Sequence, residues 1–127
     1  KLQDHSTSNP NSIAQKAAVA ALSAPEDFTR KLCQEFQQRR DYLAERLKHI
    51  QKLSFCLPQG AFYMFCDISK TGLDSMSFAE RLLEEEYVSV IPGNSFGIDD
   101  FIRISFATSM EELQKGMDRI EKWVEKL

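Results

Sequence analysis

Residues 101–107, FIRISFA, place a single arginine in the middle of an otherwise apolar strand pattern. Side chains on a β-strand alternate between its two faces, so Ile102, Ile104 and Phe106 point one way. Arg103 points the other way, and its guanidinium stays charged, so burying it without a partner would cost several kcal/mol. We therefore expect a strand with one core face and one face that presents a fixed positive charge to an anion.

Other segments complete a sheet pattern. FYMFCDI, residues 62–68, is apolar on both faces and predicts a central strand. Shorter strands are predicted at residues 53–58 and 87–93, the second ending at Pro92 and Gly93.

Four segments carry helical signals. Ser12 and Gln15 form a capping-box pattern at the start of a helix over residues 12–22, after a polar loop at residues 5–12. A longer apolar stripe runs over residues 28–50, and Ser77 is the expected cap of a helix of about ten residues. Ser109 with Glu112 is expected to cap the closing helix.

This order, two leading helices followed by β-β-α-β-β-α, predicts an α+β fold. Its small, mainly antiparallel sheet has helices packed on one face, which leaves the Arg103 face free.

The composition narrows the classes of partner. Sixteen basic and nineteen acidic residues are interspersed and give a formal charge of -3, so we expect no nucleic-acid partner. No apolar run reaches the roughly 18 residues of a membrane span, and no signal peptide is evident, so we expect a cytoplasmic protein with no membrane partner.

The cysteines and histidines are not spaced as the ligands of a metal site usually are. Cys33, Cys56 and Cys66 form no CxxC motif and no such spacing with His5 or His49, so we expect reduced, mostly buried thiols and no bound metal. His49 is expected near a helix C-terminus, where it interacts with the helix dipole.

Three stretches together carry a family resemblance: HSTSNPNSIAQKAAVAAL, PQGAFYMFCDIS and IPGNSFGIDDFIRISFATS. They resemble the C-terminal third of a fold-type I, pyridoxal-phosphate-dependent aminotransferase of the aspartate aminotransferase family, class I and II. The resemblance covers about residues 2–124. With the opening at Lys1 in place of methionine, it leads us to expect a fragment of a longer chain.

The resemblance implies a domain organisation. Residues 1–24 would be an interface loop and helix at the end of a large domain. Residues 25–127 would be the C-terminal small domain with a long interdomain helix, and the parent would be a homodimer.

The resemblance also implies site residues. Arg103 matches the arginine that binds the α-carboxylate of the substrate, a role suited to a guanidinium because its planar fork makes two parallel hydrogen bonds with a carboxylate. Gly60 matches a small residue beside the substrate pocket, although it could serve only to form a turn. Asn9, within Ser8-Asn9-Pro10, matches a stretch near the subunit interface.

The rest of the family's chemistry would lie upstream of Lys1. That part includes the lysine that forms a Schiff base with pyridoxal phosphate and the loop that binds its phosphate. We expect Lys16, Lys70 and Lys115 to be solvated charges, so the fragment alone would not be catalytic. Asp4 stands where dicarboxylate-specific members carry an arginine, which leaves the substrate open.

The sequence allows three readings of function. The first is the aminotransferase parent, which moves an amino group between an amino acid and a 2-oxo acid. The second is a pyridoxal-phosphate-dependent lyase of the same fold. The third is a stand-alone, non-catalytic module that binds carboxylates or a protein partner, and in that case Arg103 could be an ordinary surface residue or part of a structural ion pair.

Overall fold

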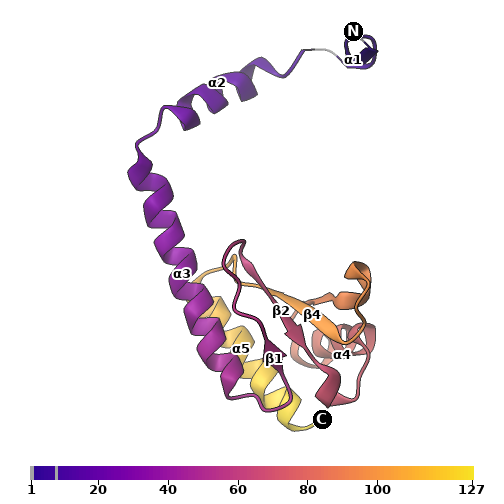
Figure 1. Ribbon diagram of the computed structural model, residues 1–127. Helices are drawn as coiled ribbons and strands as arrows, with labels where there is room; N and C mark the ends of the chain where they lie inside the picture. The colour runs from indigo at the N-terminus through magenta and orange to yellow at the C-terminus, as the bar shows by residue number, and fades with distance from the viewer. Residues whose placement is uncertain (1, 8) are drawn as a thin grey trace. The chain divides into compact units, whose positions relative to one another are not determined.

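The computed structural model describes residues 2–7 and 9–127 (Figure 1). The chain divides into two compact units, Lys1–Cys33 and Gln34–Leu127. The first unit contains α1 (Leu2–Ser6), α2 (Ser12–Leu22) and the beginning of α3 (Glu26–Lys48). The loop expected at residues 5–12 is therefore shorter, because His5 and Ser6 end α1. Ser8 lies outside the described residues.

The cap of α2 is one residue earlier than expected. The side-chain oxygen of Asn11, and not that of Ser12, accepts hydrogen bonds from the N–H groups of Ile13 (2.9 Å) and Ala14 (3.1 Å). The Gln15 side chain donates to the carbonyl of Pro10 at 2.9 Å. An asparagine side chain satisfies these free N–H groups as well as serine does, so the capping prediction was right in kind and wrong in register.

The second unit is built on a four-stranded antiparallel sheet with the order β1-β2-β4-β3. The strands are β1 (Ser54–Phe55), β2 (Tyr63–Asp67), β3 (Ile91–Pro92) and β4 (Phe101–Ser105). The prediction that β2 is central is confirmed, because it pairs with β1 on one side and β4 on the other.

One face of this sheet is covered by helices. In Figure 1, α4 (Ser75–Glu86) and α5 (Met110–Glu125) lie behind the strands. The covered face of β2 and β4 and the facing helix residues form one core, whose fully buried members include Met64, Cys66, Ile102, Phe78, Met117 and Trp123. The expected α+β architecture, a small antiparallel sheet with helices on one face, is confirmed.

Two helix starts can be compared with their predicted caps. Ser109 caps α5 as expected, with its hydroxyl accepting from the N–H of Glu112 at 3.2 Å. The cap of α4 is Asp74, which accepts from the N–H of Ser77 at 2.8 Å, so the prediction of Ser77 as the cap was wrong. Ser77 is instead the third helical residue, and its hydroxyl donates to the same carboxylate at 2.7 Å.

The strand expected at residues 87–93 is reduced to Ile91–Pro92. Tyr87 adopts a left-handed conformation (φ 56°) that ends α4, and its N–H donates to the carbonyl of Leu83 at 3.1 Å. The N–H of Val88 still donates to the carbonyl of Leu82 at 3.4 Å. Because these residues complete the helix terminus, they are not available for strand pairing.

The expectation of mostly buried thiols was wrong. Cys33 and Cys56 are exposed, and Cys66 is fully buried. Cys66 lies on the covered face of β2, where burial raises the pKa of its thiol to about 12. Cys56 follows the two-residue edge strand β1, which is too short to carry it into the core.

Among residues 2–7 and 9–127, no helix combines the length and the apolar character needed to cross a membrane.

We predict that the native chain reacts with iodoacetamide at two of its three cysteines. Cys33 and Cys56 should be alkylated at pH 8, whereas Cys66 should react only in denaturant, because it is buried and its thiolate is disfavoured. Intact mass spectrometry would show two added groups on the native chain and three on the unfolded chain. Rapid modification of Cys66 under native conditions would contradict the described core.

We also predict that Tyr87→Gly stabilises the chain. The Tyr87 side chain is 80% exposed, so its loss removes little packing, and glycine adopts φ 56° without the clash of a Cβ. The free energy of unfolding should rise by about 0.5–1 kcal/mol, measured from the urea midpoint. Tyr87→Ala keeps the Cβ, so it serves as the control and should give no comparable gain.

Candidate functional site

Arg103 lies at the centre of β4, on the sheet face that the helices leave free. It is opposite Phe65 on β2 and Ile91 on β3, and its side chain is partly buried. The flanking residues Ile102 and Ile104 point into the core. The alternation in the sequence therefore predicted both faces of this strand correctly.

Arg103 differs from the other arginines in its partners. The sequence contains seven arginines, and six of them contact an oxygen of the chain. The six are Arg30, Arg39, Arg40, Arg46, Arg81 and Arg119. Among the residues whose side chains the structure describes (2–3, 5–7 and 9–127), no oxygen is hydrogen bonded or ion paired to the guanidinium of Arg103, and its contacts are with two aromatic rings. The alternative that Arg103 belongs to a structural ion pair is therefore not supported by the described side chains.

The neighbours of the Arg103 guanidinium are aromatic rings. Its central carbon lies 4.8 Å from the ring centroid of Tyr63 and 5.0 Å from that of Phe96. Together with Phe65, these residues line an open hollow of about 230 Å³. The hollow thus combines an available cation with apolar walls, and this suits a small organic anion better than a bare inorganic one.

Phe96 reaches Arg103 from η2 (Gly93–Phe96), a short 3-10 helix before β4. The buried hydroxyl of Ser75, at the start of α4, holds this segment in place. It accepts from the N–H of Asn94 at 3.1 Å and donates to the carboxylate of Asp99 at 2.6 Å. The N–H of Ser75 donates to the same carboxylate oxygen at 3.2 Å. The rim of the hollow is therefore tied to the N-terminus of α4.

Gly60 and Asn9 were the other two predicted site residues, and neither is among the residues that line the Arg103 hollow. Gly60 is exposed, and a Cβ at this position would have no heavy atom within 4 Å. Gly60 is not among the glycines with positive φ, which are Gly72 and Gly97, so the backbone conformation at position 60 does not require glycine. Asn9 is exposed and belongs to the first unit. The roles expected for Gly60 and Asn9 stay predictions.

Three lysines were expected to be solvated, and all three are exposed in the structure. Lys16 lies in α2 and Lys70 in η1 (Ser69–Thr71). Lys115 lies in α5 and forms ion pairs with Glu111 at 2.8 Å and Glu112 at 3.0 Å, which raise its pKa. A lysine held in its charged form is poorly suited to act as a nucleophile.

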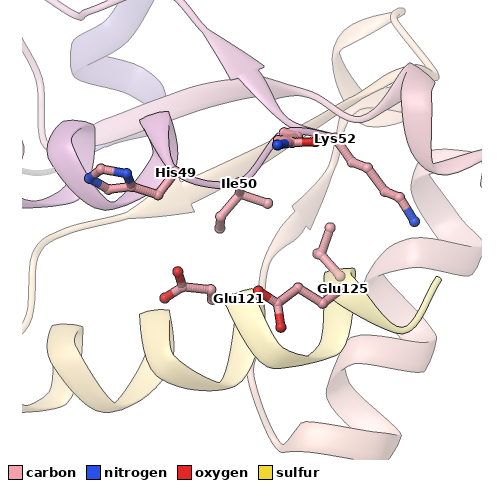
Figure 2. A pocket seen from close by; sticks show the side chains of 7 residues that line it. His49, Ile50, Lys52, Glu121 and Glu125 are labelled. Atoms are coloured by element: carbon pink, nitrogen blue, oxygen red, sulfur yellow. The ribbon is translucent and has the colours of Figure 1, made fainter.

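A larger hollow of about 320 Å³ lies between the end of α3 and α5, away from the residues around Arg103. Figure 2 shows His49 and Lys52 on one side and Glu121 and Glu125 on α5 opposite them. Two of its polar side chains already have partners, because Glu121 pairs with Arg46 at 2.6 Å and His49 lies 3.6 Å from Glu45. Its size therefore does not make it the better candidate site.

Tyr63 and Phe65 were not predicted as site residues. Both were recognised as one face of β2, but that face borders Arg103 only through the pairing of β2 with β4, which puts Phe65 opposite Arg103 and Tyr63 opposite Ser105. Phe96, in the segment before β4, also lines the hollow. The sequence did contain a signal for Tyr63 and Phe65: β2 and β4 are its two most apolar strands, and if they pair, these two side chains share a face with Arg103.

The fold and the site define a small α+β domain whose free sheet face presents a cation that has no acidic partner among the described side chains. A family model described as aminotransferase class I and II matches residues 1–120. The chain therefore belongs to the class I and II aminotransferase family, which confirms the resemblance seen in its motifs.

Individual relatives match almost the whole chain. It is 44% identical over 134 residues to the probable aspartate/prephenate aminotransferase of Rickettsia conorii, with 98% of this chain and 33% of that protein covered. The crystal structure of the Rhizobium meliloti aspartate aminotransferase matches with a TM-score of 0.92 at 37% identity, covering 99% of this chain and 34% of that one. The Pyrococcus furiosus alanine aminotransferase matches with a TM-score of 0.86 at 34% identity, covering 93% and 31%. The chain thus spans about a third of the length of these relatives.

We predict opposite effects for the same substitution at two glycines. A Cβ at Gly93 would lie 2.3 Å from the carbonyl oxygens of Ile98 and Phe101, so Gly93→Ala should displace η2 and cost about 2–3 kcal/mol of unfolding free energy. Gly116, inside α5, has open space, so Gly116→Ala should stabilise by about 0.5–1 kcal/mol. Urea unfolding measures both changes, and a neutral Gly93→Ala would contradict the close packing of the rim.

Proposed function

We propose that this chain is the C-terminal part of a pyridoxal-phosphate-dependent aminotransferase and that Arg103 binds the α-carboxylate of its substrate. One observation carries the proposal. Within the described part of the chain, Arg103 is the arginine without an oxygen partner, and it lies on the free face of the sheet beside an open hollow. A guanidinium with its donors available matches a carboxylate in charge and in planar geometry.

The role of Arg103 in the reaction is orientation. When bound, pyridoxal phosphate accepts the electrons of the substrate's Cα–H bond, which makes its proton removable. Two parallel hydrogen bonds from the guanidinium fix the carboxylate and, through it, the direction of the Cα–H bond. A displacement of about 1 Å can cost roughly 10²-fold in rate, so an anchor on a paired β-strand is well suited to this task.

The cofactor is proposed to bind to the part of the parent that precedes this chain. The exposed Lys16 and Lys70 and the ion-paired Lys115 do not fit the role of its covalent anchor. Relatives about three times as long as this chain have room for that lysine in the part that this chain does not match. We infer that these 127 residues alone do not catalyse the reaction.

The proposed organisation of the parent follows the expected boundaries. Residues 1–24 form the interface loop and helix at the end of the large domain, and residues 25–127 form the small domain, in a homodimer. Exposed apolar side chains in α2 support this assignment, because Ile13, Val19 and Leu22 are 78%, 62% and 89% exposed. Apolar groups gathered on one short helix are typical of a surface that another domain or subunit covers.

The proposed substrates are an amino acid and a 2-oxo acid. The matched relatives are named for aspartate, prephenate and alanine, which share an α-carboxylate or α-oxo-acid group. The complete gene product, loaded with pyridoxal phosphate, should therefore transfer an amino group from an amino acid of a test panel to 2-oxoglutarate. Release of pyruvate or ammonia without transamination would favour the lyase, and a reading frame that begins near Lys1 would favour the non-catalytic module.

We predict that Arg103→Leu in the complete enzyme lowers kcat/KM by at least 10²-fold. Loss of the charged hydrogen bonds leaves the carboxylate unpaired in the site, at a cost of roughly 3 kcal/mol or more. Arg103→Lys keeps the charge but loses the fork, so we expect a smaller loss of about 10-fold or more.

Arg81→Leu is the matched control for Arg103→Leu. Arg81 lies on α4 and is paired with Glu85 at 2.9 Å, so its loss should leave kcat/KM within about 2-fold of wild type. If Arg103→Leu also retained full activity, the carboxylate-binding role would be wrong even if the enzyme proved to be an aminotransferase.

A further inference from the structure

Among the described side chains, the guanidinium of Arg103 contacts aromatic rings and not an acid. A long, flexible arginine has many rotamers, and ordering it only when substrate arrives would weaken binding. Each of the other six arginines contacts an oxygen of the chain. Within the described residues, the groups closest to the Arg103 guanidinium that could order it are the rings of Tyr63 and Phe96.

We propose that Tyr63 and Phe96 are positioning residues, which hold the guanidinium of Arg103 in its carboxylate-binding orientation before the substrate arrives. This inference rests on the proposed role of Arg103. The central guanidinium carbon lies over both rings, at 4.8 Å from the centroid of Tyr63 and 5.0 Å from that of Phe96. Both distances are within the range of an attractive cation–π contact.

The chemical advantage of rings over an acid is that rings leave the donors free. A carboxylate from the chain would accept hydrogen bonds from the same N–H groups that must bind the substrate, and it would have to be displaced. An aromatic ring contacts the flat face of the guanidinium, so the N–H groups at its edge remain directed outward. The guanidinium can thus be held in one orientation while its N–H groups remain available to the substrate carboxylate.

Both rings are themselves held. Tyr63 is fixed by the pairing of β2 with β4, which puts it opposite Ser105 and diagonal to Arg103 on the same face. Phe96 is fixed by the bonds between Ser75, Asn94 and Asp99 and by an edge-on contact with Phe65, with ring centroids 5.8 Å apart.

Two further rings, Phe65 and Phe101, pack beside the rings that contact Arg103. Phe65 stacks on Phe101 with centroids 4.9 Å apart and an interplanar angle of 15°. The four rings form an aromatic platform of Tyr63, Phe65, Phe96 and Phe101 around one cation. In this platform Tyr63 and Phe96 contact the cation, and Phe65 links Phe96 to Phe101.

The kinetic test uses the complete enzyme with L-aspartate, L-alanine and L-phenylalanine as amino donors. Phe96→Leu and Tyr63→Leu should each raise KM by about 3–10-fold with kcat nearly unchanged, because the carboxylate then binds a guanidinium that is less well ordered. The factor should be the same for all three donors. Phe96→Tyr and Tyr63→Phe keep the rings and should restore KM, and Tyr87→Leu, at an exposed aromatic residue outside the hollow, is the control.

Two further results separate positioning from direct contact. In an Arg103→Leu background, Phe96→Leu should add little, since its effect acts through the guanidinium. A KM increase that depends on the donor's side chain, or one that persists without Arg103, would mean that the rings contact the substrate and would overturn the inference. An unchanged KM in both leucine variants would also overturn it.

A binding-independent measurement is the ¹⁵N relaxation of the Arg103 Nε–H group in the 127-residue chain. The order parameter should be high in wild type and in Tyr63→Phe, and it should fall in Phe96→Leu. If this holds but the complete enzyme shows no dependence on Arg103, the proposed function fails and the positioning stands. If kinetics depend on Arg103 but its order does not depend on the rings, the inference alone fails.

Discussion

The antiparallel pairing of β2 with β4 determines both the core and the candidate site. In this register Met64 lies opposite Ile104 and Cys66 opposite Ile102, which puts these four side chains on the helix-covered face. The same register leaves Arg103 on the other face. A slip of one residue would turn the guanidinium into the core and the isoleucines into solvent, so burial of the core also fixes where the cation stands.

The rim of the site depends on a second, more local interaction. Ser75 is fully buried at the start of α4, yet both its hydroxyl and its N–H find partners in the segment before β4. A buried hydroxyl without partners would cost free energy, so these bonds favour one arrangement of the rim over the alternatives. The position of Phe96 beside Arg103 is thus coupled to the packing of a helix that lies on the opposite face of the sheet.

The sequence predicted the features that depend on periodicity. Alternation in residues 101–107 placed Arg103 on the free face, and the doubly apolar run at 62–68 marked the central strand. Features that depend on a competition between neighbouring residues were predicted less well. Asp74 caps α4 in preference to Ser77, and the left-handed Tyr87 removes residues from the strand expected at 87–93.

The aromatic surroundings of Arg103 could not be predicted in full for a different reason. Phe96 reaches the guanidinium because Ser75 and Asp99, 24 positions apart, are hydrogen bonded. A contact between residues so far apart cannot be predicted from a local sequence pattern. The contact of Tyr63 with Arg103 can be predicted only once the register of β2 against β4 is known. The family resemblance pointed to the arginine, whereas the contacts that order it are visible only in three dimensions.

Under the proposed function, the free face makes the strength of carboxylate binding depend on what covers the hollow. Two unit charges 4 Å apart attract by about 1 kcal/mol in water and by about 4 kcal/mol at an effective dielectric constant of 20. The hollow around Arg103 is open to solvent on one side, so a carboxylate bound there would remain near the weaker limit. A body that covers the hollow would exclude water and strengthen the same ion pair without adding a contact to it. If Arg103 binds a carboxylate as proposed, the strength of that binding therefore depends on whether another body covers the hollow.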